Sequence, residues 1–362
     1  DVSYDVIASE PSNPYRAGIA SLYTLEFYRE VSSRLTEDGI FLQWLQCYNM
    51  DDPTMLTIYA TLKRIFDYVE SWELESGSIG FVCSQSPVRY DERLLRKRLR
   101  THPYQKAMNV TYRIDSLEGL LAHYIANDKV SQKLSMMKQA QLNTDDRTLL
   151  EYACGRILGL DKAFRLDVLR FAASKTGDHR PPIKSKNIDW ERVEDSRAMV
   201  QLSKRHAPLN FGTVALERRL RNEALAAFLR ADFRDCLTLW TKQKKRPQGP
   251  MENLIIALCL VQRREDPTSL IRHFKRVYPT EATAVEAMHC TNKKKYDEAF
   301  LAYKKFLTDI HQDPWVEVHT LRSTLGFLYD FCMASPKYSK EVFKLLGTPF
   351  PTRIVDHERV DC

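Results

Sequence analysis

Apolar and polar positions follow two different periods along the first 160 residues of the chain. Short apolar runs, which are typical of buried strands, occur at residues 4–9, 40–45, 68–73 and 79–84. Apolar positions at helical spacing predict helices at residues 21–34 and 54–66. This order predicts an α/β sheet with parallel strands. The last two strands form a predicted hairpin, which is expected to place an antiparallel strand at or near the sheet edge.

Turn and capping residues separate these elements. The sequence Glu-Asp-Gly at residues 37–39 predicts a turn before the second strand, and residues 75–77 predict the hairpin turn. Asp52 and Pro53 predict the start of a helix, because aspartate is a favoured cap and proline suits the first helical turn.

Strand patterns stop near residue 160, and helical spacing continues to the end of the chain. The stretch DHRPPIKSKN, at residues 178–187, has the composition of a linker. From residue 210 onward, helix pairs recur at uneven separations of about 30 to 40 residues, which indicates a solenoid of helical hairpins. The unit KKYDEAFLAYKKFL resembles the second helix of a tetratricopeptide repeat, with Ala299 as the small residue where helices approach.

These patterns predict three regions. Residues 1–160 are expected to form the α/β domain, residues 161–209 a helical linker region, and residues 210–362 tetratricopeptide-like helical repeats. Only 12 glycines occur in the chain, which fits a mostly helical second half.

Composition favours an ordinary globular protein. Apolar residues make up 44% and charged residues 28% of the 362 positions, and no apolar run approaches the ~18 residues that span a bilayer. The start has no signal-peptide pattern and no initiator methionine, so we expect a piece of a longer chain. The basic clusters within a net charge of +7 are interpreted as solvated helix faces and linkers, not as a nucleic-acid surface.

The cysteines are scattered and include no C-x-x-C pair. Most lie among apolar residues, which predicts buried, reduced thiols in a reducing compartment and no metal site. The eight positions are Cys47, Cys83, Cys154, Cys236, Cys259, Cys290, Cys332 and Cys362.

The first apolar run delivers an acid, Glu10, into a loop bounded by two prolines. Ligands of open α/β sheets bind beyond the carboxyl ends of the strands. Pro11 and Pro14 restrict the path of this loop. A carboxylate fixed there can accept a proton or hold a cation.

Residues 5 to about 87 resemble the C-terminal half of the spermidine synthase catalytic domain. The shared features are a strand that ends in an acid, here SEPSNP, and the later stretches SLYTLEFY, DGIFLQWLQ and SGSIGFVCS, the last of which is similar to the closing hairpin of that family. The chain resembles still more closely the spermidine-synthase-like proteins that are fused to membrane segments, through EPSNP and LNTDDRTLLEY at residues 142–152. The resemblance covers about 155 residues.

This resemblance implies a partial Rossmann-like sheet of the S-adenosylmethionine-dependent methyltransferase type. It also implies transfer of an aminopropyl group from decarboxylated S-adenosylmethionine to a polyamine, without a metal. Glu10 takes the place of the base that deprotonates the attacking amine. Asn13 takes the place of the second acid of the family loop. Substrate contacts are expected from Ser12 in the same loop, from Tyr23 and from Gln43.

The chain departs from the soluble enzymes at several positions. Glutamate is one methylene longer than the aspartate of the family, Asn13 lacks the second charge, and Leu74 stands where the family has a tyrosine. No G-x-G sequence occurs, so the loop that binds the cofactor is absent from residues 1–362. The sequence starts at the fourth strand of the family, and this chain alone is therefore predicted to be inactive.

Each candidate site residue also has an interpretation in which its role is only structural. Glu10 can cap a loop or helix, Asn13 can form an Asx-type turn, and an aromatic such as Tyr23 at helical spacing is typical of a core. Trp44 and Trp72 are also assigned to the core. The charged run 145–147 is interpreted as an N-capping turn with a local ion pair, ahead of a functional role.

Three functions remain open. The first is an aminopropyltransferase-like transferase of polyamine biosynthesis whose cofactor half lies upstream. The second is a non-catalytic scaffold whose helical repeats bind a protein partner. The third is a methyltransferase that uses ordinary S-adenosylmethionine. The resemblance to the membrane-fused group implies a full-length inner-membrane protein, anchored outside this sequence, whose present portion faces the cytoplasm.

Overall fold

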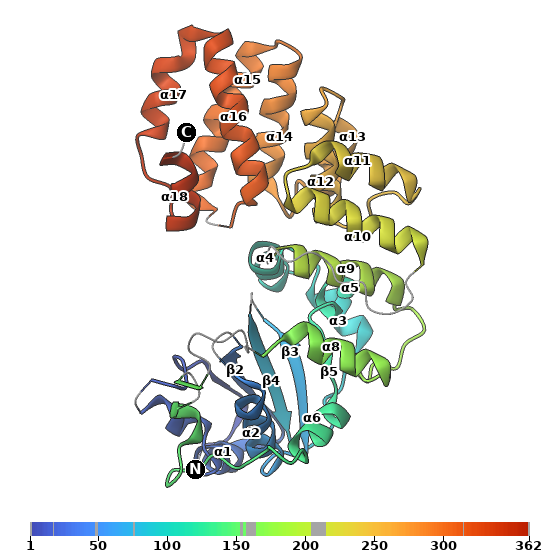
Figure 1. The fold of residues 1–362 in the computed structure, drawn as a ribbon, viewed down its shortest axis with the longest axis vertical. Helices are drawn as coiled ribbons and strands as arrows, with labels where there is room; N and C mark the ends of the chain where they lie inside the picture. The colour runs from blue at the N-terminus through green and yellow to red at the C-terminus, as the bar shows by residue number, and fades with distance from the viewer. Residues whose placement is uncertain are drawn as a thin grey trace. The chain divides into compact units, whose positions relative to one another are not determined.

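A computed structural model describes residues 2–16, 18–47, 50–74, 77–152, 155–156, 164–203, 215–313 and 315–360. Its contacts divide the chain into two compact units, which Figure 1 traces by residue number. The α/β unit consists of Asp1–Leu95 and Leu120–Ile188. The helical unit consists of Arg96–Gly119 and Asp189–Cys362. Each unit is therefore built from two separate stretches of sequence, whereas the predicted regions are continuous.

The α/β unit is organised around a mixed sheet of five strands, with the order β1-β2-β4-β3-β5 in the described residues. Only β1 and β2 pair in parallel; the other neighbouring strands are antiparallel. A sheet of this kind followed by many helices confirms an α/β plus helical fold. The strands are β1 Tyr4–Ser9, β2 Leu35–Gln46, β3 Tyr68–Glu73, β4 Ser78–Ser84 and β5 Tyr124–Ala126.

The predicted hairpin places its antiparallel strand β3 next to the edge strand β5, but its other strand is central. β4 lies in the middle of the sheet, because it pairs with β2 over Phe41–Gln46 as well as with β3. Every residue of β4 except Val82 is buried, as expected for a strand with neighbours on both edges. The edge strands of the described sheet are β1 and β5. The sequence patterns did not predict the short β5.

The second strand is longer than predicted and contains the predicted turn. Thr36, Glu37, Asp38 and Gly39 lie opposite the single residue Asp5, between the pairs that Tyr4 and Val6 form with β2. The four residues therefore form an irregularity within the strand and do not reverse the chain. Thr36 Oγ1 donates a hydrogen bond of 3.0 Å to Asp5 at this point.

The predicted helices occur with shifted starts. The helix predicted at residues 21–34 is divided into a 3-10 turn, η1 Ile19–Tyr23, and α1 Leu25–Ser33, because Thr24 caps α1 through a bond from the Phe27 N–H. The next helix, α2 Asp52–Lys63, is capped by Asp51 and not by Asp52. Asp51 accepts the Thr54 N–H at 3.0 Å, and Pro53 lies in the first turn as predicted.

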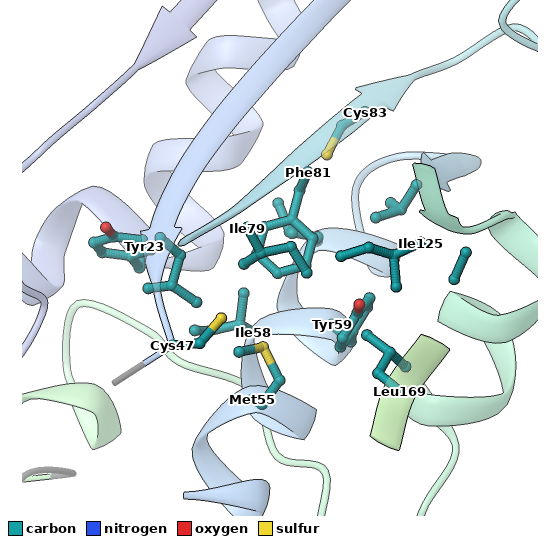
Figure 2. Close-up of a cluster of buried hydrophobic side chains, with 14 of the residues drawn as sticks. Tyr23, Cys47, Met55, Ile58, Tyr59, Ile79, Phe81, Cys83, Ile125 and Leu169 are labelled. Carbon is teal, nitrogen blue, oxygen red and sulfur yellow. The ribbon is translucent and has the colours of Figure 1, made fainter. Parts of the chain in front are cut away.

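One face of the sheet packs against these helices in a continuous apolar core. Figure 2 shows Tyr59 and Ile58 of α2 beside Phe81 and Ile79 of β4, with Leu169 at one side. Trp44 and Trp72, which were assigned to the core, are half-buried. The remaining elements are α3 Glu92–Arg98, which spans the boundary of the two units, and α6 Asp128–Ser135, η3 Leu149–Tyr152 and α8 Leu166–Lys175 of the α/β unit.

The described part of the helical unit contains no strand. Its first stretch holds α4 Tyr104–Ala107, η2 Met108–Tyr112 and most of α5 Leu117–Leu121. Its second stretch holds α9 Trp190–Ser203, α10 Leu216–Leu229, α11 Phe233–Lys242, α12 Pro250–Gln262, α13 Thr268–Phe274, α14 Pro279–Asn292, α15 Tyr296–Asp309, η4 Ile310–Gln312, α16 Val318–Ala334, η5 Pro336–Tyr338, α17 Ser339–Leu346 and α18 Arg353–Val360.

Figure 1 labels the helices of three consecutive hairpins, α10–α11, α12–α13 and α14–α15, and the same backbone turn closes each of them. The first residue after the helix cap is left-handed in each, with φ of 57° at Ala231, 61° at Arg264 and 59° at Lys294. The next N–H then donates to the carbonyl five residues back, at 2.9 Å in all three hairpins. This pattern is the Schellman ending, here formed without glycine. The same turn therefore recurs at three places between α10 and α15.

Candidate functional site

Glu10 lies directly beyond the carboxyl end of β1. Because β1 and β2 are parallel, their carboxyl ends point to the same end of the sheet. Ser9, the last residue of β1, is paired with Gln43 of β2. The Glu10 side chain is exposed and forms none of the hydrogen bonds or ion pairs found among the described residues. A carboxylate in this position is accessible to a ligand at the edge.

Gln43 is buried beside this carboxylate-bearing loop. Its Nε2 donates to the Trp44 carbonyl at 3.0 Å and, at 3.5 Å, to the Ser9 carbonyl. Its Oε1 is buried and has no hydrogen-bond partner among the residues that the structure describes. An unpaired buried acceptor costs free energy, on the order of 1–3 kcal/mol, that a donor from a ligand can recover.

Tyr23 comes from η1 and lies against the same part of β2. Its hydroxyl donates to the Trp44 carbonyl at 3.2 Å. Burial raises the pKa of Tyr23 above its ordinary value, although a hydrogen bond with Gln43 opposes this effect. Tyr23 is therefore a neutral phenol at physiological pH and can donate but not act as a base. It is also a fully buried member of the core cluster.

The loop after Glu10 is folded on itself. Asn13 Nδ2 donates to the Tyr15 hydroxyl at 2.6 Å, and the Asn13 carbonyl accepts the Arg16 N–H at 3.0 Å. Asn13 is half-buried, while Ser12 is exposed. The structure thus brings Glu10, Gln43 and Tyr23 to one edge of the sheet and turns the Asn13 amide toward Tyr15.

The segment LNTDDRTLLEY has a clear packing role at Asn143. This fully buried side chain donates to the carbonyls of Ala20 at 3.3 Å and Tyr23 at 3.1 Å. Its own N–H donates to Thr61 of α2 at 3.0 Å. Asn143 therefore fixes η1, and with it Tyr23, against α2. Sequence reasoning missed this residue, although an asparagine in a loop rich in polar groups is a recognisable signal.

The charged run after Asn143 forms a tight turn. Two backbone hydrogen bonds between Thr144 and Arg147, of 3.2 and 3.0 Å, close it. Asp145 contributes its backbone N–H to a Glu26 carboxylate oxygen at 3.0 Å. Glu26 belongs to the first turn of α1, so this contact again ties the segment to the helix that follows Tyr23.

A cavity of about 280 Å³ lies at the start of α2, away from the predicted site residues. Asp51 and Arg156 form a two-point ion pair at its wall, with Nε at 2.8 Å and Nη2 at 3.1 Å from the carboxylate oxygens. Burial alone would raise the pKa of Asp51, but hydrogen bonds from Arg156 and Thr54 lower it below its ordinary value. The lining residues are Asp51, Pro53, Thr54, Thr57, Gln139, Gln141, Leu149, Leu150 and Arg156.

Two buried carboxylates on β3 were also missed. Glu70 accepts a hydrogen bond from Tyr90, and burial raises its pKa to about 7. Glu73 accepts from Arg170 at 2.6 Å. His123 Nδ1 lies 3.0 Å from the Glu73 carbonyl, and burial, with a smaller effect of Arg170, lowers the pKa of His123 to about 3. The imidazole is therefore neutral.

Comparison with protein-family models finds no match to this chain, and comparison with curated proteins finds none either. Within the described residues, no three His, Cys, Asp or Glu side chains are placed to hold one metal ion together. In the same part of the chain, no helix combines the length and the apolar character that a membrane crossing requires.

Proposed function

We propose that the α/β unit carries the amine-binding half of a spermidine synthase-like aminopropyltransferase site. The observation that carries the proposal is the pairing of Ser9 with Gln43, which places the exposed Glu10 one residue beyond the neighbour of Gln43, whose buried amide oxygen has no hydrogen-bond partner among the described residues. Both groups are hydrogen-bond acceptors, and an ammonium group offers the donors that they lack. The residues present therefore fit a polyamine end group.

In this role Glu10 removes a proton from the ammonium of the polyamine. The free amine nitrogen then uses its lone pair to attack the methylene carbon of the aminopropyl group. A new C–N bond forms, the C–S bond breaks, and its electron pair converts the sulfonium into a neutral thioether. Glu10 keeps the proton until solvent takes it. Gln43 and neutral Tyr23 orient the amine and the backbone around it.

The proposal assigns nucleoside binding to residues outside this sequence, because a G-x-G turn is absent from residues 1–362. The parallel β1–β2 pair, followed by the antiparallel hairpin β3–β4, supports a methyltransferase-type sheet of which this chain forms one part. Alone, the 362-residue chain is expected to have no turnover and no measurable affinity for decarboxylated S-adenosylmethionine.

The test uses the full-length protein with putrescine and decarboxylated S-adenosylmethionine. Glu10→Gln keeps the size of the side chain and removes the base, so turnover should fall at least ~100-fold. Glu37→Gln is the matched control, since Glu37 is an exposed carboxylate in the irregular part of β2, and its turnover should be unchanged. Normal turnover of Glu10→Gln would remove the base assignment.

A companion variant tests the polyamine pocket itself. Asn13→Asp restores the second carboxylate of the family loop, so calorimetry should record tighter binding of a diamine. Ordinary S-adenosylmethionine in the same assay examines the third function: methyl transfer to an acceptor, without aminopropyl transfer, would favour a methyltransferase. A full-length protein that binds neither nucleoside nor diamine would favour the scaffold.

The scaffold function is a second candidate, supported by the helical unit. The repeated Schellman turns of α10 to α15 support a tetratricopeptide-like solenoid, an architecture that offers extended surfaces to protein partners. The proposed cytoplasmic-facing location on an inner membrane rests on the resemblance alone. Fractionation of the full-length protein decides it, and recovery only in the soluble fraction would contradict it.

A further inference from the structure

One part of the helical unit is attached through very few buried groups. We call residues 101–115 the strap; it includes α4 and η2. Asn109 is the one buried residue between positions 101 and 112, all of which the structure describes. Segments with few buried contacts open at low free-energy cost. The printed contacts between the strap and the later helices come from its last residues: the buried contacts of Arg113, and Asp115, which accepts a hydrogen bond of 3.2 Å from the exposed Arg276.

Arg113 inserts into the body of the helical unit. Its Nη1 donates to the Val277 carbonyl at 2.7 Å, and its Nη2 donates to Asp313 Oδ1 at 2.5 Å. The guanidinium carbon lies 5.2 Å from the centre of the Tyr278 ring, in cation–π contact. Only 12% of the side chain is exposed. Arg113 thus reaches a carbonyl, a carboxylate and an aromatic face together.

We call the groups around Arg113 the socket: Val277, Tyr278, Thr280, Glu281 and Asp313. Thr280 Oγ1 donates to Asp313 Oδ2 at 3.0 Å and holds this carboxylate in position. Glu281 is fully buried; its Oε1 accepts the Glu317 N–H at 2.9 Å, and its Oε2 has no hydrogen-bond partner in the described part of the chain. Asp313 therefore pairs with the guanidinium directly, whereas Glu281 interacts with Arg113 through charge and keeps one buried acceptor unused.

The backbone of the strap is strained where it enters the socket. Arg113 has a φ of 53°, in the left-handed region, which costs a residue with a side chain about 1 kcal/mol or more. The side-chain contacts of Arg113 hold it there. A free peptide that presents arginine in an ordinary backbone conformation makes the same contacts without this cost.

We propose that the socket is a recognition site for an arginine side chain of a protein partner, and that Arg113 occupies it as a competing internal ligand. The geometry selects arginine over lysine. Two donors must diverge to a carbonyl and a carboxylate while a flat group lies over a ring, and an ammonium group satisfies only part of this arrangement. While the strap is closed, Arg113 fills the socket and the partner cannot bind. The apparent affinity for the partner is therefore the affinity of the open socket multiplied by the fraction of molecules in which the strap is open.

The probe is a labelled peptide with the strap's own sequence at residues 106–118, KAMNVTYRIDSLE. Its binding to the 362-residue chain is measured by fluorescence anisotropy. The Arg113→Ala chain, with an empty socket, should bind the peptide at least ~10-fold more tightly than the unchanged chain. Arg272→Ala removes an exposed arginine of α13 and is the matched control, which should bind as weakly as the unchanged chain.

Two changes establish what is recognised. A peptide with lysine in place of the arginine should bind the Arg113→Ala chain at least ~10-fold more weakly, and a peptide with alanine should not bind. Adding Asp313→Asn to the Arg113→Ala chain should also abolish binding. Equal affinity of the two chains for the arginine peptide, or equal affinity of the arginine and alanine peptides, would overturn the proposal.

Hydrogen exchange of the unchanged chain keeps the proposal testable if Arg113→Ala does not fold. Excess arginine peptide should displace the strap and accelerate amide exchange in residues 104–114. The alanine peptide should leave this exchange unchanged. No acceleration by the arginine peptide would show that Arg113 is a fixed structural contact and would refute the competition.

Discussion

Glu70→Gln tests the cost of burying a carboxylate on the central part of the sheet. Glu70 is 4% exposed, and among the described residues it has no ion-pair partner; its carboxylate accepts a hydrogen bond from the Tyr90 hydroxyl, and Tyr124 is a second hydrogen-bond partner. Burial raises the pKa of Glu70 from 4.5 to about 7. At about 1.4 kcal/mol per pKa unit, this difference corresponds to about 3 kcal/mol of unfolding free energy.

The sign follows from the number of protons bound. Between pH 4.5 and about 7, folded Glu70 keeps a proton that the unfolded chain has already released. Stability contributed by this group is therefore fully present below pH 4.5 and decreases as the pH rises through 7. Glutamine has no proton to lose and can still accept the hydrogen bond from Tyr90.

Urea unfolding of the two proteins at a series of pH values from 4.5 to 8 measures the effect. The difference in unfolding free energy, Glu70→Gln minus the unchanged chain, should increase by about 3 kcal/mol over this range. Glu281, whose pKa is also raised to about 7 by burial, is present in both proteins and cancels in the difference. Glu37→Gln, at an exposed carboxylate, should give a flat difference. A flat difference for Glu70→Gln would refute the reasoning.

Three further predictions address a buried ion pair, core packing and the redox state of the cysteines. Arg170→Met removes the guanidinium that Glu73 binds at 2.6 Å and should lower the unfolding free energy by about 3–5 kcal/mol, whereas Arg165→Met, at an exposed pair, should cost under about 1 kcal/mol. Ala299→Leu should cost about 1–3 kcal/mol in the same urea assay, because Ala299 is fully buried in the core of the helical unit. Thiol titration under denaturing, non-reducing conditions should count close to eight cysteines; a count near zero would contradict reduced thiols.

The sequence predicted four of the five strands of the described sheet because each has a local apolar run. β5 has only three residues, which is too short for any periodic pattern. The place of β4 depends on which distant strand it joins, and hairpin spacing does not contain that information. The nearly continuous apolar stretch of β4 was the available signal, since burial on both faces is typical of a central strand.

The site residues also differ in whether a local sequence pattern identifies them. Glu10 was recognisable because a strand end and two prolines are local features. The two consecutive aspartates before Pro53 are both good caps, and only the backbone at Asp51 selects between them. Arg113 and Asp313 are separated by 200 residues, so their contact has no local pattern at all. Contacts of this kind become visible only when the chain is folded.

That separation also sets an order of events during synthesis. Ribosomes add roughly 5–20 residues per second, so Asp313 is made about 10–40 s after Arg113. During this interval the strap exists on the nascent chain while the socket does not. The second stretch of the α/β unit, Leu120–Ile188, is translated within the same period. A chaperone or other factor that binds short basic segments therefore has its best access to Arg113 on the ribosome, before the socket has been synthesised and can bind that side chain.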